Sequence, residues 1–226
     1  MMIIYCLYHN HKLAGMNLRY KRYLTFVKMD RSNFVLDAPK HVNMYNIPNF
    51  KSIGKDCAEY ELYYNLYSAQ SLLSDYVGFI QYDMKFNPKV LTIKMSPNDI
   101  IVFQAYKFNA IWEQPMTFYD KNSLDVLVGD FNQIYSKNIS IADIKSSTLP
   151  MCGSIVIHKD KFNLVMKGMV EFINTKLNAH KNAMKCGWTK KRYEGQILER
   201  FMAITLVGLK LKQIPFKISH ACGSGV

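Results

Sequence analysis

The chain lacks the short motifs by which several large enzyme classes are recognised. It contains no Walker loop, no G-x-G-x-x-G, no H-E-x-x-H and no G-x-S-x-G. P-loop, dinucleotide-binding, zinc-protease and α/β-hydrolase interpretations therefore lose their main support. The five cysteines are odd in number and form no C-x-x-C pair. That pattern argues against a disulfide framework or a cysteine-rich zinc site, and it favours a reducing compartment, the cytoplasm.

Long apolar runs are also missing. Residues 201–209, FMAITLVGL, are the longest such run near the carboxyl terminus. They reach about half of the ~20 residues that a membrane span requires. The opening MMIIYCLYH has no basic residue before its apolar ones. We therefore expect neither a signal peptide nor a transmembrane segment.

Acidic residues are scarce. The 226-residue chain has 17 Asp and Glu against 29 Lys and Arg, which gives a net charge of +12. Such an excess suits an anionic partner: nucleic acid, an acidic membrane surface or a phosphorylated small molecule. With 49% apolar residues, the chain can bury one sizeable core. We expect a single domain over residues 1–220, followed at 221–226 by a linker to further domains of a longer polypeptide.

Hydrophobic patterning predicts strands that alternate with helices along the chain. The helical spacing is clearest at 121–136, where the apolar residues share one face. This alternation predicts an α/β fold, with a mixed central sheet and helices on both of its faces. The predicted strands are 2–8, 76–82, 99–103, 154–158 and 213–218, and the predicted helices are 58–73, 121–136, 160–177 and 192–207.

Polar residues follow three of these strands. In open α/β sheets, ligands bind beyond the carboxyl ends of the strands. The three stretches to consider are Tyr8–Lys12, Gln81–Asp83 and His158. The first of them, YHNHK, offers donors for a base, a ribose or a phosphate from His9, His11 and Lys12. A plain polar loop explains the same stretch equally well.

A few ionisable residues are candidates for chemistry. Asp83 ends the apolar run YVGFIQYD, and a carboxylate there can hold Mg²⁺ or Mn²⁺ together with substrate phosphates. His220, after the apolar IPFKI, is a second candidate metal ligand. A solvated strand end and a surface histidine are the ordinary alternatives. In RYEGQILERF, Glu199 is a candidate catalytic carboxylate and Arg192 a candidate phosphate ligand, although a charged amphipathic helix face explains both.

Taken in order, several stretches resemble a family of glycosyltransferases of capsule and polysaccharide synthesis with a GT-A-type fold. Residues 56–83, DCAEYELYYNLYSAQSLLSDYVGFIQYD, resemble the family's E-L-T-x-x-Y-W-x-W-K-N-like helix and VGLxHYRRY-like strand. Residues 152–162, CGSIVIHKDKF, resemble its N-M-F-I-M-x-K-x-x-F segment. Residues 192–201 resemble its R-x-x-G-F-x-x-E-R-L-like helix. The overall sequence is also similar to the amino-terminal glycosyltransferase domain of a larger virus-encoded protein, which would place it in the host cytoplasm.

The resemblance implies transfer of a hexosyl or deoxyhexosyl unit from a nucleotide-diphosphate donor, foremost a UDP-sugar, to a glycan acceptor. Glu199 would act as a general base with inversion, or would stabilise an oxocarbenium-like centre with retention. The turn 151–153 and His158 would border the sugar or the acceptor. The donor-binding residues that the resemblance implies are Tyr8, His9, His11, Lys12, Gln81, Tyr82, Asp83, Gly153 and Arg192.

This chain departs from the family pattern at two places. Gln81 and Asp83 stand where the family has His and Arg, so the strand ends in Q-Y-D. This is a degenerate form of the D-x-D by which many GT-A enzymes hold a metal and a nucleoside diphosphate. We therefore expect Mn²⁺ or Mg²⁺, with Asp83 and His220 as ligands. Gly153 replaces an Asn of the family, which would enlarge the sugar pocket.

Two other functions fit the composition. A basic nucleic-acid-binding protein without catalysis would use the +12 charge and the 15 tyrosines for phosphate contacts and base stacking. The tyrosines of the 58–73 helix have the spacing of packed residues, however, and no RNA-binding motif is present, so we expect no nucleic-acid partner. A degenerate glycosyltransferase fold that serves as an interaction module is the other alternative.

Overall fold

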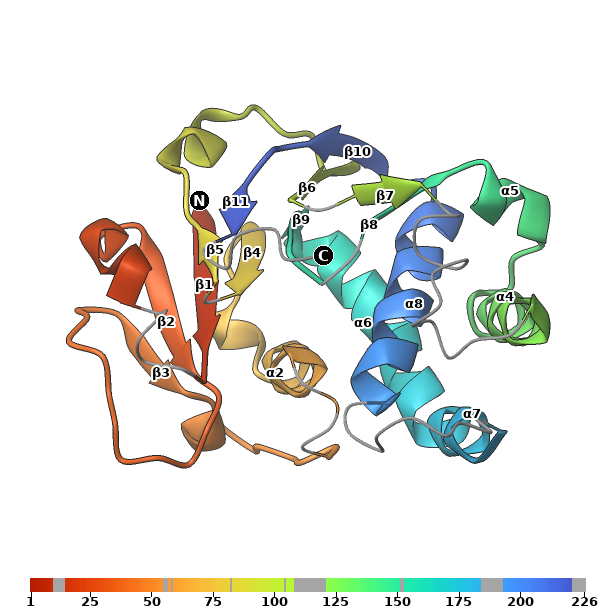
Figure 1. Cartoon of the computed structure of the whole chain (residues 1–226), viewed down its shortest axis with the longest axis horizontal. Helices are drawn as coiled ribbons and strands as arrows, with labels where there is room; N and C mark the ends of the chain where they lie inside the picture. Colours follow the sequence, from red (N-terminus) through yellow and green to blue (C-terminus); the bar gives the residue numbers. More distant parts are fainter. Residues whose placement is uncertain are drawn as a thin grey trace.

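The computed structural model describes residues 1–9, 15–54, 57, 59–81, 83–103, 105–107, 121–150, 153–183 and 193–220. Its centre is a seven-stranded sheet with the strand order β10-β6-β9-β4-β1-β2-β3 (Figure 1). These strands are β1 (Met2–Tyr8), β2 (Leu24–Lys28), β3 (His41–Asn43), β4 (Tyr76–Gln81), β6 (Asp99–Val102), β9 (Ile155–His158) and β10 (Lys212–Pro215). Two smaller sheets pair β5 (Met84–Lys85) with β11 (Ser219–His220), and β7 (Ala105–Lys107) with β8 (Thr148–Pro150).

Strand direction decides which strand ends meet. β1 is parallel to β2 and β4, and β2 is parallel to β3. β9 runs antiparallel to both of its neighbours, β4 and β6, whereas β10 is parallel to β6. The carboxyl ends of β1 to β4 therefore lie together, beside the start of β9. We call this side of the sheet the carboxyl edge and the opposite side the amino edge.

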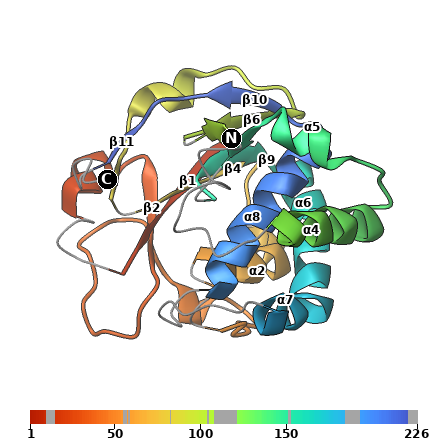
Figure 2. The same cartoon turned by 45° about the vertical axis from the view of Figure 1, so that its right-hand side comes forward.

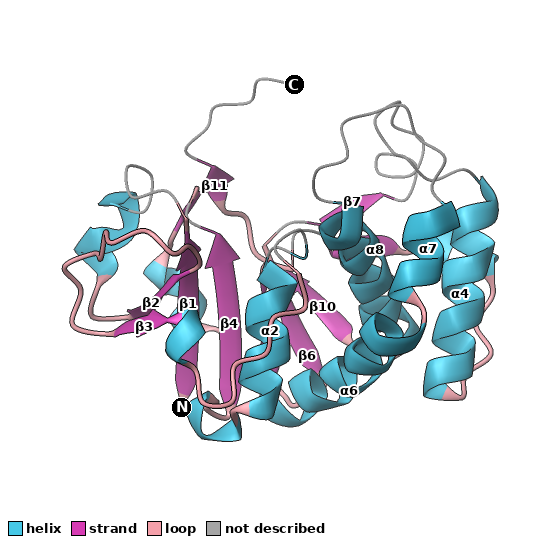
Figure 3. Ribbon diagram, turned by 90° about the horizontal axis from the view of Figure 1, so that it is seen from below, coloured by secondary structure: helices cyan, strands magenta, loops and turns pink. Residues whose placement is uncertain are grey.

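One face of the sheet packs against the α-helices, which stand together on the same side in Figures 2 and 3. Strand residues such as Tyr5, Phe79 and Ile157 join a buried cluster with helix residues such as Phe172 and Phe201. The rings of the last two stack with centroids 3.9 Å apart. The helices are α2 (Glu59–Ser68), α4 (Lys121–Tyr135), α5 (Ile141–Lys145), α6 (Lys159–Thr175), α7 (Leu177–Ala183) and α8 (Tyr193–Gly208).

The other face of the sheet is covered by shorter elements. Ile4, Cys6 and Phe26 alternate with the residues of the first face and belong to a second buried cluster. That cluster is closed by the 3-10 helices η1 (Gly15–Tyr20) and η5 (Pro88–Thr92) and by the segment around β10. The predicted mixed sheet with helices on its two faces is thus confirmed, and the helices of this second face are of the short 3-10 kind.

The predicted strands and helices are all present, with small shifts at their ends. The predicted helix 58–73 stops at Ser68 because Ala69 leaves helical backbone geometry, with φ −104° and ψ 63°. The side chain of Gln70 then donates to the Tyr67 carbonyl at 2.7 Å, and a 3-10 turn, η4 (Gln70–Leu72), follows. Tyr60 and Tyr63 of α2 are buried. The interpretation of these tyrosines as packed residues is confirmed.

The expectation that His158 borders the substrate is wrong. Because β9 is antiparallel to β4, His158 pairs with Tyr76 at the start of β4 and lies at the amino edge. There it begins α6: its Nδ1 accepts a hydrogen bond from the backbone N–H of Asp160 at 3.3 Å. Its ring also packs edge-on against Tyr76, with centroids 5.1 Å apart.

Candidate active site

The chain reverses its direction of travel across the sheet at the carboxyl edge between β1 and β4. From β1 it moves outward to β2 and β3, and it then returns to the other side of β1 as β4. The register places Tyr8 beside Lys28 and Lys28 beside Asn43, with Leu7 beside Gln81. Ligands of open α/β sheets bind in the crevice that opens at such a point. The candidate site is therefore the carboxyl edge around these strand ends.

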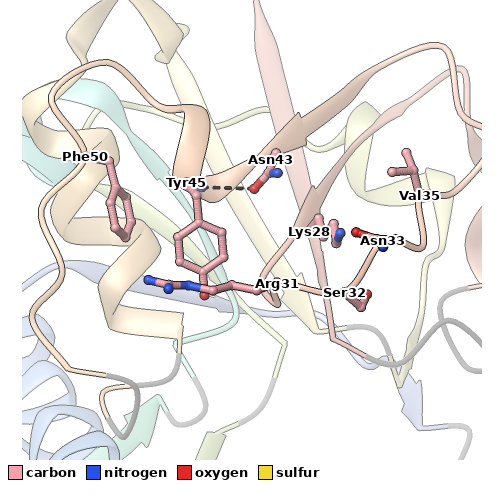
Figure 4. Close-up of a pocket in the computed structure, with 8 residues that line it drawn as sticks. All are labelled: Lys28, Arg31, Ser32, Asn33, Val35, Asn43, Tyr45 and Phe50. Carbon is pink, nitrogen blue, oxygen red and sulfur yellow. Dashed lines mark hydrogen bonds between the residues drawn. The ribbon is translucent and has the colours of Figure 1, made fainter.

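A pocket of about 590 Å³ lies at the carboxyl ends of β2 and β3 (Figure 4). Its size is within the range of small-molecule sites. Polar and aromatic side chains from both strand ends and from the loops that follow them line it: Lys28, Arg31, Ser32, Asn33, Asn43, Tyr45 and Phe50. None of these seven residues was predicted from the sequence. LTFVKMD at 24–30 is an apolar run that ends in charged residues, as the run at 76–83 does, and this similarity was the available signal.

The pocket combines a buried positive charge with aromatic surface. Lys28 is only 4% exposed, and its Nζ lies 3.9 Å from Oδ1 of Asp30. The Arg31 guanidinium stands over the Tyr45 ring, 5.0 Å from its centroid, as Figure 4 shows. Tyr45 in turn meets Phe50 edge-on at 5.2 Å. Such a wall suits a ligand that carries both a planar ring and negative charge.

Tyr8 supports this pocket from inside the sheet. Burial raises the pKa of Tyr8, and burial together with the Lys28 charge lowers the pKa of His41. The Tyr8 hydroxyl and the neutral His41 ring are joined by a hydrogen bond between Oη and Nε2, at 2.6 Å. The backbone N–H of Leu36 also donates to the Tyr8 hydroxyl, at 3.4 Å. Since these contacts engage its hydroxyl, Tyr8 holds the loop around Leu36 in place, and a role in donor binding stays a prediction.

At the end of β4, an amide meets a carboxylate from the helix layer. Nε2 of Gln81 donates to Oε1 of Glu59 at 3.3 Å. Glu59 is the first residue of α2. The contact adds Glu59 to the carboxyl edge. Strand pairing brings these two residues together, so their separation in the sequence gave no signal.

Asp83 lies in the turn between β4 and β5, and its Oδ1 is shielded from solvent. The pKa of the Cys6 thiol is raised to about 12, chiefly by burial, and the nearby Asp83 charge contributes to that increase. The carboxylate of Asp83 is thus close to β1 as well as to β4. In the small sheet, His220 pairs with Met84, the residue after Asp83. The structure therefore places the backbone of the two predicted metal ligands side by side.

Gly153 does not open a sugar pocket in the way the sequence analysis expected. A Cβ atom at this position would lie 2.8 Å from the Tyr63 hydroxyl and 3.0 Å from its ring. That hydroxyl donates to the Gly153 carbonyl at 3.0 Å. The space that the glycine leaves is therefore filled by Tyr63, and the expectation of an enlarged sugar pocket is wrong. Gly153 still lies at the carboxyl edge, directly before β9.

Glu199 belongs to the helix layer. It is half-buried in α8, which packs against α2 and β8. The neighbouring Arg200 is buried and donates from Nη1 to the Gln196 carbonyl at 3.1 Å. His9, the first residue after β1, is exposed at the carboxyl edge. The catalytic role of Glu199 and the donor contact of His9 stay predictions.

The other predicted site residues lie outside the described residues. These are His11, Lys12, Tyr82 and Arg192, together with Met151 and Cys152 of the predicted turn. Among the residues that the structure describes, no three His, Cys, Asp or Glu side chains form a ready metal cluster. A metal at Asp83 would therefore need ligands beyond such a cluster of described side chains. In the same described part of the chain, no helix is both long and apolar enough to cross a membrane.

The fold is of the GT-A type. The chain is similar to the bifunctional glycosyltransferase WbbM in its apo structure, with a TM-score of 0.59 and 14% identity. The match covers 98% of this chain and 45% of the WbbM chain, so the chain spans less than half of that protein. The galactosyltransferase LgtC, solved with donor and acceptor sugar analogs, matches with a TM-score of 0.39 and 12% identity, over 99% of this chain and 88% of LgtC. No protein-family model and no curated protein sequence matches.

Proposed function

We propose that the chain is a glycosyltransferase that moves a hexosyl or deoxyhexosyl unit from a UDP-sugar to a glycan acceptor with the help of Mn²⁺ or Mg²⁺. The observation that carries this proposal is the convergence at the carboxyl edge. Asp83 lies there in the turn that follows β4, and His220 is the register partner of Met84, the next residue. The GT-A-type fold supports it independently.

The donor would lie across the ends of β1, β2 and β4. We assign the nucleoside to the pocket at the ends of β2 and β3, where Tyr45 and Arg31 offer a flat surface and Lys28 and Asn43 offer polar contacts. The diphosphate would then extend from there toward Asp83. This arrangement adds the ends of β2 and β3 to the sequence-based assignment, in which the opening strand and Tyr8–Lys12 line the nucleotide.

A divalent metal fits the donor set at the end of β4. Asp83 supplies the carboxylate oxygens that Mg²⁺ and Mn²⁺ prefer, and His220 is the second protein ligand that we propose from its backbone position opposite Met84. Diphosphate oxygens would complete the coordination. When bound, such a metal neutralises the charge that develops on the departing diphosphate. Gln81 lacks a charge, so Asp83 is the essential ligand of the Q-Y-D stretch.

Two carboxylates are candidates to act on the acceptor hydroxyl. Glu199 is the candidate from the sequence, and Glu59, which accepts from Gln81 at 3.3 Å, is the candidate from the structure. A general base has to lie within hydrogen-bond reach of the hydroxyl proton that it accepts. Glu199→Gln and Glu59→Gln separate the two, since only the variant of the true base should lose transfer while keeping UDP binding.

Thermal unfolding with UDP tests the donor site. A ligand at 100 times its Kd stabilises a protein by about 2.7 kcal/mol, which corresponds to roughly 5–10 °C for a chain of this size. We expect UDP with Mn²⁺ to raise the Tm of the wild type by that amount, and UDP with EDTA to raise it much less. For Asp83→Asn, the Tm increase should be the same with UDP and Mn²⁺ as with UDP and EDTA. Asp125→Asn, an exposed carboxylate on α4, is the matched control and should behave as the wild type does.

The outcomes separate the parts of the proposal. If the Tm increase of Asp83→Asn still depends on the metal, Asp83 is not a metal ligand. An absence of any shift with UDP and with a panel of other nucleotide sugars would contradict the glycosyltransferase assignment and leave the interaction-module alternative. Transfer or hydrolysis of the donor by the wild type would contradict that alternative.

A further inference from the structure

A second pocket lies behind the β5–β11 pair, on the face that the 3-10 helices cover. Its volume is about 540 Å³. Three separate segments each contribute a cation to it: Arg19 at the end of η1, Lys85 in β5 and Lys217 just before β11. No acidic residue is among the described residues that line it. The pocket is therefore strongly positive.

The framework of this basic pocket is fixed by buried contacts. Asn17 of η1 is fully buried, and its Nδ2 donates to the Met84 carbonyl at 2.8 Å. Its Oδ1 accepts from the Phe86 N–H at 2.9 Å, so that one side chain ties η1 to β5. Phe86 is buried and meets Tyr20 edge-on at 5.4 Å. These contacts hold the backbone on either side of Lys85.

The third segment is fixed by strand pairing. Ser219 of β11 is the register partner of Lys85, which places Lys217 close to the same end of the small sheet. All three cations are exposed. Arg19 stands over the ring of Tyr20, 4.7 Å from its centroid. The fold thus brings three cations from distant parts of the sequence to one hollow and holds their backbones there.

Such an arrangement is unfavourable without a ligand, because the three positive charges repel one another. None of the three belongs to an ion pair with an acidic residue within the part of the chain that the structure describes. An arginine guanidinium binds phosphate through two parallel hydrogen bonds, and lysine adds point charges. The Ser219 hydroxyl can add a further donor. A dianionic phosphate group matches this set in both charge and number of acceptor oxygens.

We propose that this pocket binds a phosphate group of its own. It shares no described lining residue with the pocket at the β2 and β3 ends. It adjoins the proposed metal site, because Lys85 is two residues after Asp83 and Ser219 directly precedes His220. The ligand is a phosphate ester or diphosphate, carried either by a soluble molecule or by a lipid headgroup. The proposal concerns binding and does not depend on sugar transfer.

Titration calorimetry with inorganic pyrophosphate tests the pocket. The full chain is kept in EDTA at constant ionic strength, so that no metal-dependent site contributes. The double variant Lys85→Gln/Lys217→Gln should weaken binding at least tenfold. The matched control Lys137→Gln/Lys167→Gln removes two exposed lysines elsewhere and the same net charge, and it should bind as the wild type does. Equal weakening in both variants, or no binding to the wild type, would overturn the proposal.

A second arm distinguishes the sources of the phosphate. Binding of the protein to vesicles of neutral lipid and phosphatidic acid is measured with and without free pyrophosphate as a competitor. Binding to these vesicles that Lys85→Gln/Lys217→Gln abolishes, and that pyrophosphate displaces, supports a lipid headgroup. Pyrophosphate binding without vesicle binding supports a soluble ligand.

Unfolding with UDP and Mn²⁺ keeps this proposal distinct from the proposed function. The same double variant should retain the full Tm increase. If the variant loses that increase, the pocket is a part of the donor site and the claim of a separate site is wrong. If the wild type binds pyrophosphate through these lysines but never responds to nucleotide sugars, the pocket stands and the glycosyltransferase assignment does not.

Discussion

The two edges of the central sheet carry similar polar residues and use them differently. At the amino edge, His158 begins α6 and accepts from the backbone of Asp160, so both residues serve local structure. At the carboxyl edge, Lys28, Gln81 and Asp83 stand where connections diverge and pockets open. The difference follows from chain direction. Short turns precede the parallel strands at the amino edge, whereas the connections that follow these strands diverge at the carboxyl edge. An ionisable residue is therefore a better functional candidate when strand direction places it at the carboxyl edge.

One Asp from each edge gives the largest expected contrast. Asp83→Asn should lower the transfer rate on the order of 10²-fold or more, the size of loss seen when a charge-stabilising group is removed. Asp160→Asn at the amino edge should leave the rate unchanged, because this exposed carboxylate lies beside the His158 ring, far from the carboxyl edge. Initial rates with a responsive nucleotide sugar measure both. Equal transfer rates for the two variants would show that the two edges do not differ in function.

Gly153 at the carboxyl edge and Gly129 in α4 form the next pair. Gly153 has φ 58°, and an added Cβ would press on Tyr63. We expect Gly153→Ala to lower the free energy of unfolding by about 3 kcal/mol, from backbone strain and overpacking together. An added Cβ at Gly129 meets nothing within 4 Å, so Gly129→Ala should stabilise the helix by about 0.5–1 kcal/mol. Urea denaturation compares them, and a neutral Gly153→Ala would show that Tyr63 moves aside.

His158→Ala tests the purely local role of the amino edge. Loss of a helix cap destabilises a protein by about 1 kcal/mol. We expect that loss in urea denaturation, with the UDP-dependent Tm increase unchanged. If His158→Ala had normal stability but bound UDP more weakly, His158 would contact the substrate, which would contradict the placement of β9.

The smallest expected effect is a dependence of stability on mildly acidic pH that originates at the ends of β1 to β3. The folded protein lowers the pKa of His41 below its ordinary 6.5, through burial and the Lys28 charge. As the pH falls below about 6.5, the unfolded chain takes up the proton first, so the stability is complete above this pH and declines below it. His41→Gln should flatten the decline between pH 7 and 5, and Lys28→Met should lessen it. An unchanged slope in His41→Gln would assign the decline to other groups.

Sequence patterns predicted the longer elements because burial of one face leaves a periodic signal. The strand 2–8 and the helix 121–136 are examples, and both lie within a residue of their predicted bounds. The three-residue strand β3 has too few residues for any period. The direction of β9 was equally hidden, because SIVIH reads the same in a parallel and an antiparallel strand. That single unknown put His158 at the wrong edge.

The candidate site was predictable only where one local run carried the signal. Asp83 was found because it ends an apolar strand, and the structure places it at the carboxyl edge beside the strand that pairs with His220. The contact of Gln81 with Glu59 and the cation–π pair of Arg31 with Tyr45 depend on how separate segments pack. Gly153 shows the same limit, since its sequence position could not reveal that Tyr63 fills the space beside it.

The pairing of β11 with β5 has a consequence for the order of synthesis. On the ribosome, residues 1–83 emerge long before residue 220, so the chain can assemble β1, β2, β3 and β4 without their last partner. The β5–β11 pair and the basic pocket beside it can form only after β11 has emerged. A nascent chain would therefore already hold β1 to β4 while it still lacked one proposed metal ligand and one pocket cation. Completion of both proposed sites would wait for this strand.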